Sequence, residues 1–255
     1  MTPPLQLQHP LQHPRQPPVQ HPLQKKTRCL GMLAGLGVGA AIHYYRELAL
    51  AAEQNQRTLD MVMVHAQTSQ VFAYVEAGDR EGLAAYLSGF IARSQAAGAE
   101  FAIIPAVTPH YCLQPLTAIS PLPVLNIVDP LLREVTARQI RRISVFGAMP
   151  VMKSALYGLA GDVEIVTAQP EELETIHKTY LSLLQTQTGT AEQHRTLTSI
   201  AHAIVKREEV DAIVLAGTDL SLIFNPANID FPYLDCAALH LQAIEEAMLN
   251  STPPA

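Results

Sequence analysis

Residues 29–54 read CLGMLAGLGVGAAIHYYRELALAAEQ, and this stretch decides the fold class. Lys25, Lys26 and Arg28 precede an apolar run over 29–42, an order that is typical of a secretory signal peptide. The run has 14 residues, which is too few to span a bilayer, and it continues into an amphipathic helical pattern. We therefore predict a buried first strand, a glycine turn and a helix rather than an export signal.

Short apolar runs alternate with longer amphipathic stretches along the rest of the chain. Strands that alternate with helices in this way indicate an α/β fold with parallel sheets, covered by helices on both faces. The predicted strands are 29–34, 59–65, 101–105, 123–127, 142–147, 163–167, 211–216 and 231–235. The predicted helices are 39–54, 80–97, 109–118, 129–139, 150–159, 170–186, 190–207 and 236–249.

Three segments of the first half recur in the second half in the same order. The pairs are LGMLAG (30–35) with ISVFGA (143–148), FAIIPA (101–106) with AIVLAG (212–217), and LPVLN (122–126) with FPYLD (231–235). This order predicts an internal duplication and two pseudo-symmetric lobes, 28–127 and 128–250, with the closing helix 236–249 packing across. Ligands of parallel sheets bind beyond the carboxyl ends of the strands, so we expect the site between the lobes.

Composition and charge exclude several classes of partner. Residues 1–24 are mostly Pro, Gln and His, and we predict disordered tails over 1–27 and 251–255, although 48% of the whole chain is hydrophobic. The first 28 residues hold four bases and no acid, so the remainder carries 13 bases against 23 acids and suits nucleic acid poorly. Cys29, Cys112 and Cys236 form neither a disulfide framework nor a CxxC metal site, which favours a reducing cytoplasm.

The glycine turn GLGVGAA (35–41) matches the GxGxxA fingerprint of dinucleotide-binding folds. The second predicted strand would then end in an acid for the ribose, but it ends in His65-Ala66-Gln67. This mismatch disfavours a nicotinamide site. A nest of backbone amides that holds a carboxylate or an enolate fits the turn better.

Two further strand ends carry polar side chains. In PAVTPHYC (105–112), Thr108 is a natural helix N-cap before Pro109, and His110 is a candidate acid or base in the first turn. In AGTDLSL (216–222), Thr218 and Asp219 occupy the equivalent place in the second half. The alternative is that these side chains only cap helices.

Four features of residues 28–250 together resemble the aspartate/glutamate racemase superfamily. They are the duplicated halves, the turn GMLAGLG followed by HYYREL, the strand ends PAVTPH and AGTDLSL, and the closing segment FPYLDCAALHLQAIEEAML. The resemblance implies a cofactor-independent enzyme that works between two pseudo-symmetric lobes. It also implies two cysteines on opposite sides of the substrate's α-carbon, and a homodimer.

The sequence departs from this superfamily at the residues that matter most for its chemistry. Ala106 stands where the resemblance places the first cysteine, and Gly217 stands where it places the second. The segment 58–79 lacks the Lys or Arg that would hold a substrate carboxylate, and 148–152 is apolar, although Ser154 fits the pattern. An unpaired buried carboxylate costs several kcal/mol, so an apolar ligand suits the site better than a dicarboxylic amino acid.

Three hypotheses follow. The first is an isomerase or lyase that moves protons on a small, apolar carbonyl or carboxylate compound without thiols; the second is a non-catalytic ligand-binding or regulatory protein; the third is an amino-acid racemase with a non-cysteine acid/base pair. We expect a small-molecule ligand, no nucleic acid, no membrane, no metal and no cofactor. The predicted catalytic residues are His110 and Asp219, and the predicted substrate-binding residues are Gly35, Gly37, Ser69, Gln70, Ala106, Thr108, Met149, Ser154, Gly217 and Thr218.

Overall fold

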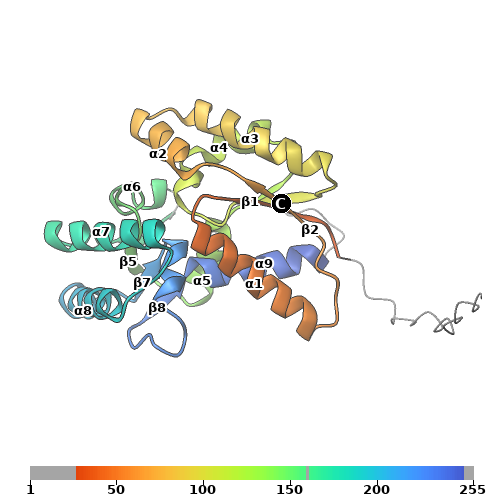
Figure 1. Ribbon diagram of the computed structural model, residues 1–255. Helices are drawn as coiled ribbons and strands as arrows, with labels where there is room; N and C mark the ends of the chain where they lie inside the picture. The colour runs from red at the N-terminus through yellow and green to blue at the C-terminus, as the bar shows by residue number, and fades with distance from the viewer. Residues whose placement is uncertain (1–26, 159–160, 250–255) are drawn as a thin grey trace, which may run out of the picture.

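The computed structural model describes residues 27–158 and 161–249, which form two four-stranded parallel sheets flanked by helices (Figure 1). The predicted α/β class is therefore confirmed. The strand order is β2-β1-β3-β4 in the first sheet and β6-β5-β7-β8 in the second. The two orders are equivalent, as an internal duplication predicts.

The first sheet consists of β1 (Leu30–Ala34), β2 (Met61–His65), β3 (Phe101–Ile103) and β4 (Val124–Leu125). The side chains of β1 alternate between two helical layers, because successive residues of a strand point to opposite faces. Leu30 and Met32 pack against α1 (Val38–Gln54) and α9 (Cys236–Leu249). Leu33 packs on the other face, against α3 (Arg80–Ala96).

The helices of that second layer are α2 (Thr68–Ala77), α3 and α4 (Leu113–Ile119), which lie above the first sheet in Figure 1. The short 3-10 helix η1 (Thr108–Cys112) precedes α4. Helix α2 is absent from the sequence prediction. Its only buried residue is Val71, so it lacks the broad apolar stripe by which a helix is recognised in sequence.

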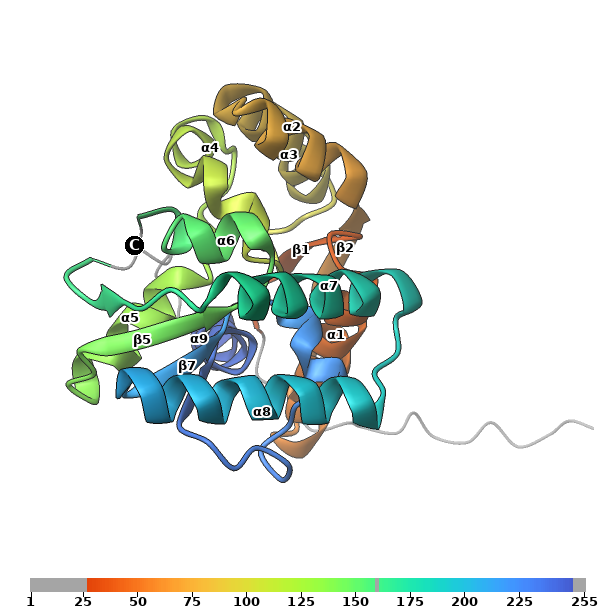
Figure 2. The ribbon, with the colours of Figure 1, turned by 90° about the vertical axis from the view of Figure 1, so that its left-hand side faces the viewer.

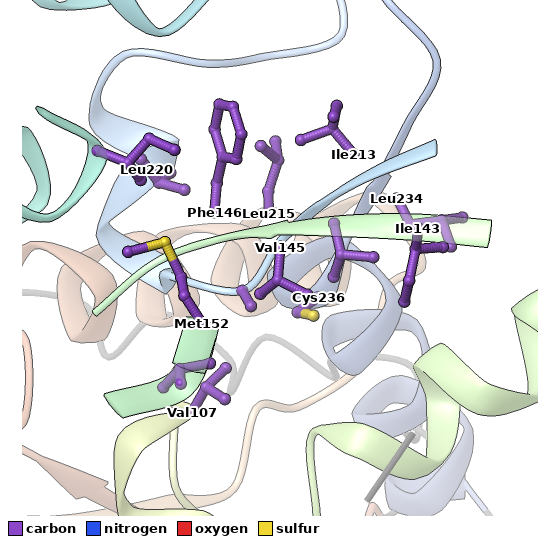
Figure 3. Close-up of a cluster of buried hydrophobic side chains, with 14 of the residues drawn as sticks. Val107, Ile143, Val145, Phe146, Met152, Ile213, Leu215, Leu220, Leu234 and Cys236 are labelled. Atoms are coloured by element: carbon purple, nitrogen blue, oxygen red, sulfur yellow. The ribbon is translucent and has the colours of Figure 1, made fainter. Parts of the chain in front are cut away.

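The second sheet consists of β5 (Arg142–Phe146), β6 (Glu164–Ile165), β7 (Ala212–Leu215) and β8 (Tyr233–Asp235). Phe146 and Leu215 are register partners and lie on one face of the sheet, whereas Val145 lies on the other (Figure 3). Figure 2 shows α7 (Pro170–Thr186) and α8 (Ala191–Glu208) side by side over one face, with α5 (Val128–Ala137) and α9 behind the strands. The 3-10 helix η3 (Thr218–Leu222) follows β7.

The helix predicted over 150–159 is shorter in the structure. Helix α6 (Met149–Lys153) ends before η2 (Leu156–Gly158), and residues 159–160 lie outside the described part. Ala155, Leu156 and Tyr157 have φ angles of 52°, 55° and 59°, which no right-handed helix can contain.

The predicted tails also lie outside the described residues, apart from Thr27. Thr27 is buried, and its hydroxyl donates to the carbonyl oxygen of Thr58. Within the described ranges, no helix is both long and apolar enough to cross a membrane.

Candidate functional site

The loops that follow β3 and β7 meet between the two sheets. The hydroxyl of Thr218 donates to the carbonyl oxygen of Pro105 over 2.9 Å, and both atoms are buried. The two residues lie at equivalent strand ends of the duplicated halves. The predicted juxtaposition of these two strand ends is therefore present in the structure.

Asp219 lies against the N-terminus of α1. Its Oδ1 accepts a hydrogen bond of 3.1 Å from the backbone N–H of Ala40, and its side chain is fully buried. The N-cap residue of α1 is Gly37, which has no side chain, and a Cβ atom there would lie 2.3 Å from Oδ2 of Asp219. One backbone amide at the N-terminus of α1 thus binds a carboxylate, and this carboxylate belongs to the chain itself.

The second oxygen of this carboxylate, Oδ2, has no hydrogen-bond partner among the described residues. Burial raises the pKa of Asp219 from 3.8 to about 6, against the opposing effect of the hydrogen bond from Ala40. A carboxyl group with such a pKa exchanges protons near neutral pH, which is a property of many functional acids.

His110 is buried, and both of its ring nitrogens bind the backbone. Nδ1 lies 2.9 Å from the carbonyl oxygen of Ala106, which can only accept, so Nδ1 carries the proton. Nε2 accepts a hydrogen bond of 3.2 Å from the N–H of Ile127. Burial lowers the pKa of His110 to about 4, so the ring is neutral and ties together the segments after β3 and β4.

His240 in α9 is buried and has a comparable structural role. Its Nε2 donates to the carbonyl oxygen of Leu125 over 3.0 Å, and its Nδ1 lies 3.1 Å from the hydroxyl of Tyr44. Burial lowers the pKa of His240 to about 3. The two neutral histidines thus connect β4 to α1, α9 and η1.

The position that the resemblance assigns to the second cysteine is occupied by an aromatic ring. A Cβ atom on Gly217 would lie 2.4 Å from Cε2 of Tyr180, a buried residue of α7. Ala106, at the other assigned position, is buried as well. The sequence gives no sign of Tyr180, because its partner is a glycine 37 residues further along the chain.

Burial disfavours the thiolate form of both Cys112 and Cys236. Sγ of Cys112 donates to the carbonyl oxygen of Pro109 over 3.3 Å, and burial raises the pKa of Cys112 to about 12. Cys236 is also buried, and its pKa is raised for the same reason. Both groups are therefore protonated thiols at neutral pH.

Between the strand ends there is a cavity of about 10 Å³, which has room for about one water molecule. The residues that line it are Leu36, Thr68, Val71, Phe72, Thr108, Pro109, Tyr180 and Leu184. Of the predicted site residues, only Thr108 belongs to this lining. His110 and Asp219 do not line it.

The other predicted ligand-binding residues are dispersed. Gly35 has a φ of 83°, and its carbonyl oxygen accepts from the hydroxyl of Thr68. Ser69 and Gln70 are exposed on α2, so Thr68 is the polar residue of this segment that reaches the cavity. Ser154 donates to the carbonyl oxygen of Pro150, within its own helical turn.

Met149 lines a second and larger space, which we call the α2–α6–α7 groove. This groove has a volume of about 440 Å³. Its lining consists of Phe72, Glu76, Met149, Pro150, Lys153, His177 and Leu181. Phe72 lines both the groove and the small cavity, so the two spaces are neighbours.

A family model described as Asp/Glu/Hydantoin racemase matches residues 33–244. The chain belongs to this racemase family. A solved structure of a putative Asp/Glu racemase from Yersinia pestis is 20% identical with a TM-score of 0.74, and the match covers 88% of this chain and 100% of that one. An aspartate racemase homologue from Pyrococcus horikoshii is 18% identical with a TM-score of 0.70, over 89% of this chain and 100% of that one.

Glutamate racemase from Francisella tularensis, solved with D-glutamate, is a more distant structural relative. It is 13% identical with a TM-score of 0.60, over 88% of this chain and 84% of that chain. A search of the curated proteins found no match. The racemase fold is thus shown over nearly all of the described chain.

Proposed function

We propose that this racemase-family chain binds a small, largely apolar molecule and catalyses neither proton exchange nor decarboxylation of it. The observation that argues against turnover is the lining of the small cavity between the strand ends, and the space that is large enough for such a molecule is the α2–α6–α7 groove. Among the described residues, the only titratable side chain in that lining is Tyr180. Burial raises the pKa of Tyr180 well above 10, so it is not a base near neutral pH.

Two-base racemisation needs one group that removes a proton and another, on the opposite side of the α-carbon, that returns it. At the two positions where the resemblance places such groups, Ala106 and Gly217 cannot take up a proton. The ring of Tyr180 packs where a side chain of residue 217 would lie. These contacts support binding rather than turnover.

The contacts between the two strand ends support the same conclusion. The hydroxyl of Thr218 donates to the carbonyl oxygen of Pro105, and Oδ1 of Asp219 accepts from the N–H of Ala40, so both side chains already bind backbone groups of the chain. A ligand carboxylate would have to displace the carboxylate of Asp219 from the N-terminus of α1. An apolar ligand that leaves these bonds in place meets no such cost.

Two readouts on one sample test the proposal. The compounds are a panel of α-amino acids, α-aryl acids, β-keto acids and other monocarboxylates. Proton NMR in D₂O detects exchange of their α-protons and loss of CO₂. Thermal unfolding of the protein detects their binding. We expect stabilisation by at least one apolar compound and no chemical change in any of them. Steady exchange or decarboxylation of any compound would overturn the proposal.

A second candidate function is supported by the free Oδ2 of Asp219 and its pKa of about 6. In this alternative the strand ends separate, and Asp219 acts as a single base in an isomerase or lyase. Any turnover would then be lost in Asp219→Asn and retained in His110→Gln, since His110 has no free ring nitrogen. The third hypothesis, an amino-acid racemase with a non-cysteine acid/base pair, has no support from the described lining of the cavity, because Tyr180 is the only titratable residue in it. A homodimer and a cytoplasmic location stay predictions.

A further inference from the structure

The α2–α6–α7 groove has the size of a small-molecule site. Its volume of about 440 Å³ falls within the range of about 300–1,000 Å³ that is common for such sites. Helix α6 lies between α2 and α7 in both views (Figures 1 and 2). The helices that border the groove thus come from both halves of the duplicated fold.

The walls of the groove are mainly apolar. Phe72, Met149, Pro150 and Leu181 line it, and all four are half-buried. An apolar chain that covers these side chains would remove their remaining exposed surface from water, which favours binding.

Two hydrogen-bond donors lie on the α6 and α7 sides of the groove. Nδ1 of His177 accepts a hydrogen bond of 3.1 Å from the backbone N–H of Met149. The proton of the neutral ring is therefore on Nε2, which has no hydrogen-bond partner among the described residues. The exposed ammonium group of Lys153 lines the same groove, and it forms no ion pair within the part of the chain that the structure describes.

Glu76 adds the opposite charge from α2. It is exposed, and it forms no ion pair with Lys153 in the described ranges. A ligand with a second carboxylate would meet this charge, whereas a ligand with one carboxylate and an apolar tail would not. The groove therefore favours monocarboxylates over dicarboxylates.

We propose that the α2–α6–α7 groove binds a monocarboxylate with an apolar tail, the carboxylate lying between Lys153 and His177 and the tail against Phe72 and Leu181. The inference rests on the proposed ligand-binding function and assigns that function a site and a class of ligand. The site lies outside the cavity between the strand ends.

Calorimetric titration of the full chain with hexanoate, 1-hexanol and adipate tests the inference. Hexanoate should bind more tightly than 1-hexanol, which lacks the charge, and than adipate, which has a second one. Lys153→Met should weaken hexanoate binding by about tenfold, the usual effect of losing a charged hydrogen bond. Glu76→Gln should improve the binding of adipate relative to hexanoate.

Lys178→Met is the matched control, since Lys178 is an exposed lysine of α7 that pairs with Glu174 and does not line the groove. It should bind hexanoate as the wild type does, and equal thermal unfolding of all variants shows that they are folded. Absence of hexanoate binding, or equal loss in Lys153→Met and Lys178→Met, would overturn the groove assignment. Binding of other apolar compounds would still support the proposed function, and α-proton exchange would overturn that function alone.

Discussion

The carboxylate of Asp219 accepts a hydrogen bond from the backbone N–H of Ala40, a residue that lies 179 positions earlier in the chain. The bond joins η3, which follows β7 of the second sheet, to the first turn of α1 beside the first sheet. In the glycine turn of α1, the chain's own acid occupies the place where a ligand anion could bind. The consequences for stability and for chemistry can be measured separately.

Gly37→Ala should destabilise the fold by about 3 kcal/mol. Gly37 has a φ of 145°, which side chains rarely adopt, and a Cβ atom would lie 2.3 Å from Oδ2 of Asp219. Chemical denaturation gives the free energy of unfolding. The matched control is Gly89→Ala in α3, where a Cβ atom meets nothing within 4 Å and alanine should stabilise the helix by about 0.5–1 kcal/mol. Equal effects of the two substitutions would contradict the close contact with Asp219.

Gly217→Ala should also destabilise the fold, by about 1–3 kcal/mol. Gly217 has an ordinary φ of −107°, so the cost comes from the ring of Tyr180 at 2.4 Å from the added Cβ atom and not from backbone strain. A double-mutant cycle with Tyr180→Leu measures this directly. The cost of Gly217→Ala should fall by about 1 kcal/mol or more in the Tyr180→Leu background, and an unchanged cost would mean that Tyr180 does not occupy this space.

Ionisation of Asp219 should lower the stability of the wild type as the pH rises from 4 to 6. The folded-state pKa of about 6 lies above the usual 3.8, so over this interval the folded chain keeps a proton that the unfolded chain releases. Asp219→Asn removes the effect. The difference in the free energy of unfolding, Asp219→Asn minus wild type, should increase by up to about 3 kcal/mol as the pH rises across this interval. Above pH 7 the difference should be constant. Parallel curves for the two proteins would show that Asp219 has an ordinary pKa.

The buried histidines should have the opposite effect. The folded-state pKa of His110 is about 4 and that of His240 about 3, and both lie below the usual 6.5. Below pH 6.5 these histidines therefore bind protons in the unfolded chain and stay neutral in the folded chain. Stability contributed by these rings is complete above pH 6.5 and is lost as the pH falls toward 4. His110→Gln should reduce the slope of stability against pH by up to about 1.4 kcal/mol per unit in this range. An unchanged slope, measured by denaturation at several pH values, would contradict a buried neutral ring.

The sheets could be predicted from the sequence because their strands are short apolar runs bounded by turns. All eight predicted strands are present, and the order of the repeated segments anticipated two sheets of equivalent topology. Thr218 and Pro105 could be expected near each other for the same reason, since both follow central strands of the repeat.

The details of the site could not be predicted in this way because they depend on contacts between distant segments. Nothing near Gly217 in the sequence indicates that Tyr180 covers it, and nothing near His110 indicates that Ile127 would bind its second nitrogen. The pKa shifts of His110 and Asp219 come mainly from burial, which a motif does not reveal. The same dependence on tertiary contacts explains why Thr68, and neither Ser69 nor Gln70, reaches the cavity.

The most direct test of the central claim is the rate at which the wild-type protein incorporates deuterium at the α-carbon of amino, aryl and keto acids in D₂O, measured by proton NMR. We expect no incorporation above the rate without protein, because the only titratable residue in the described lining of the cavity is Tyr180, whose pKa burial raises well above 10. Incorporation that is present in the wild type and absent in Asp219→Asn would contradict it, and would assign the proton transfer to the carboxylate that now caps α1.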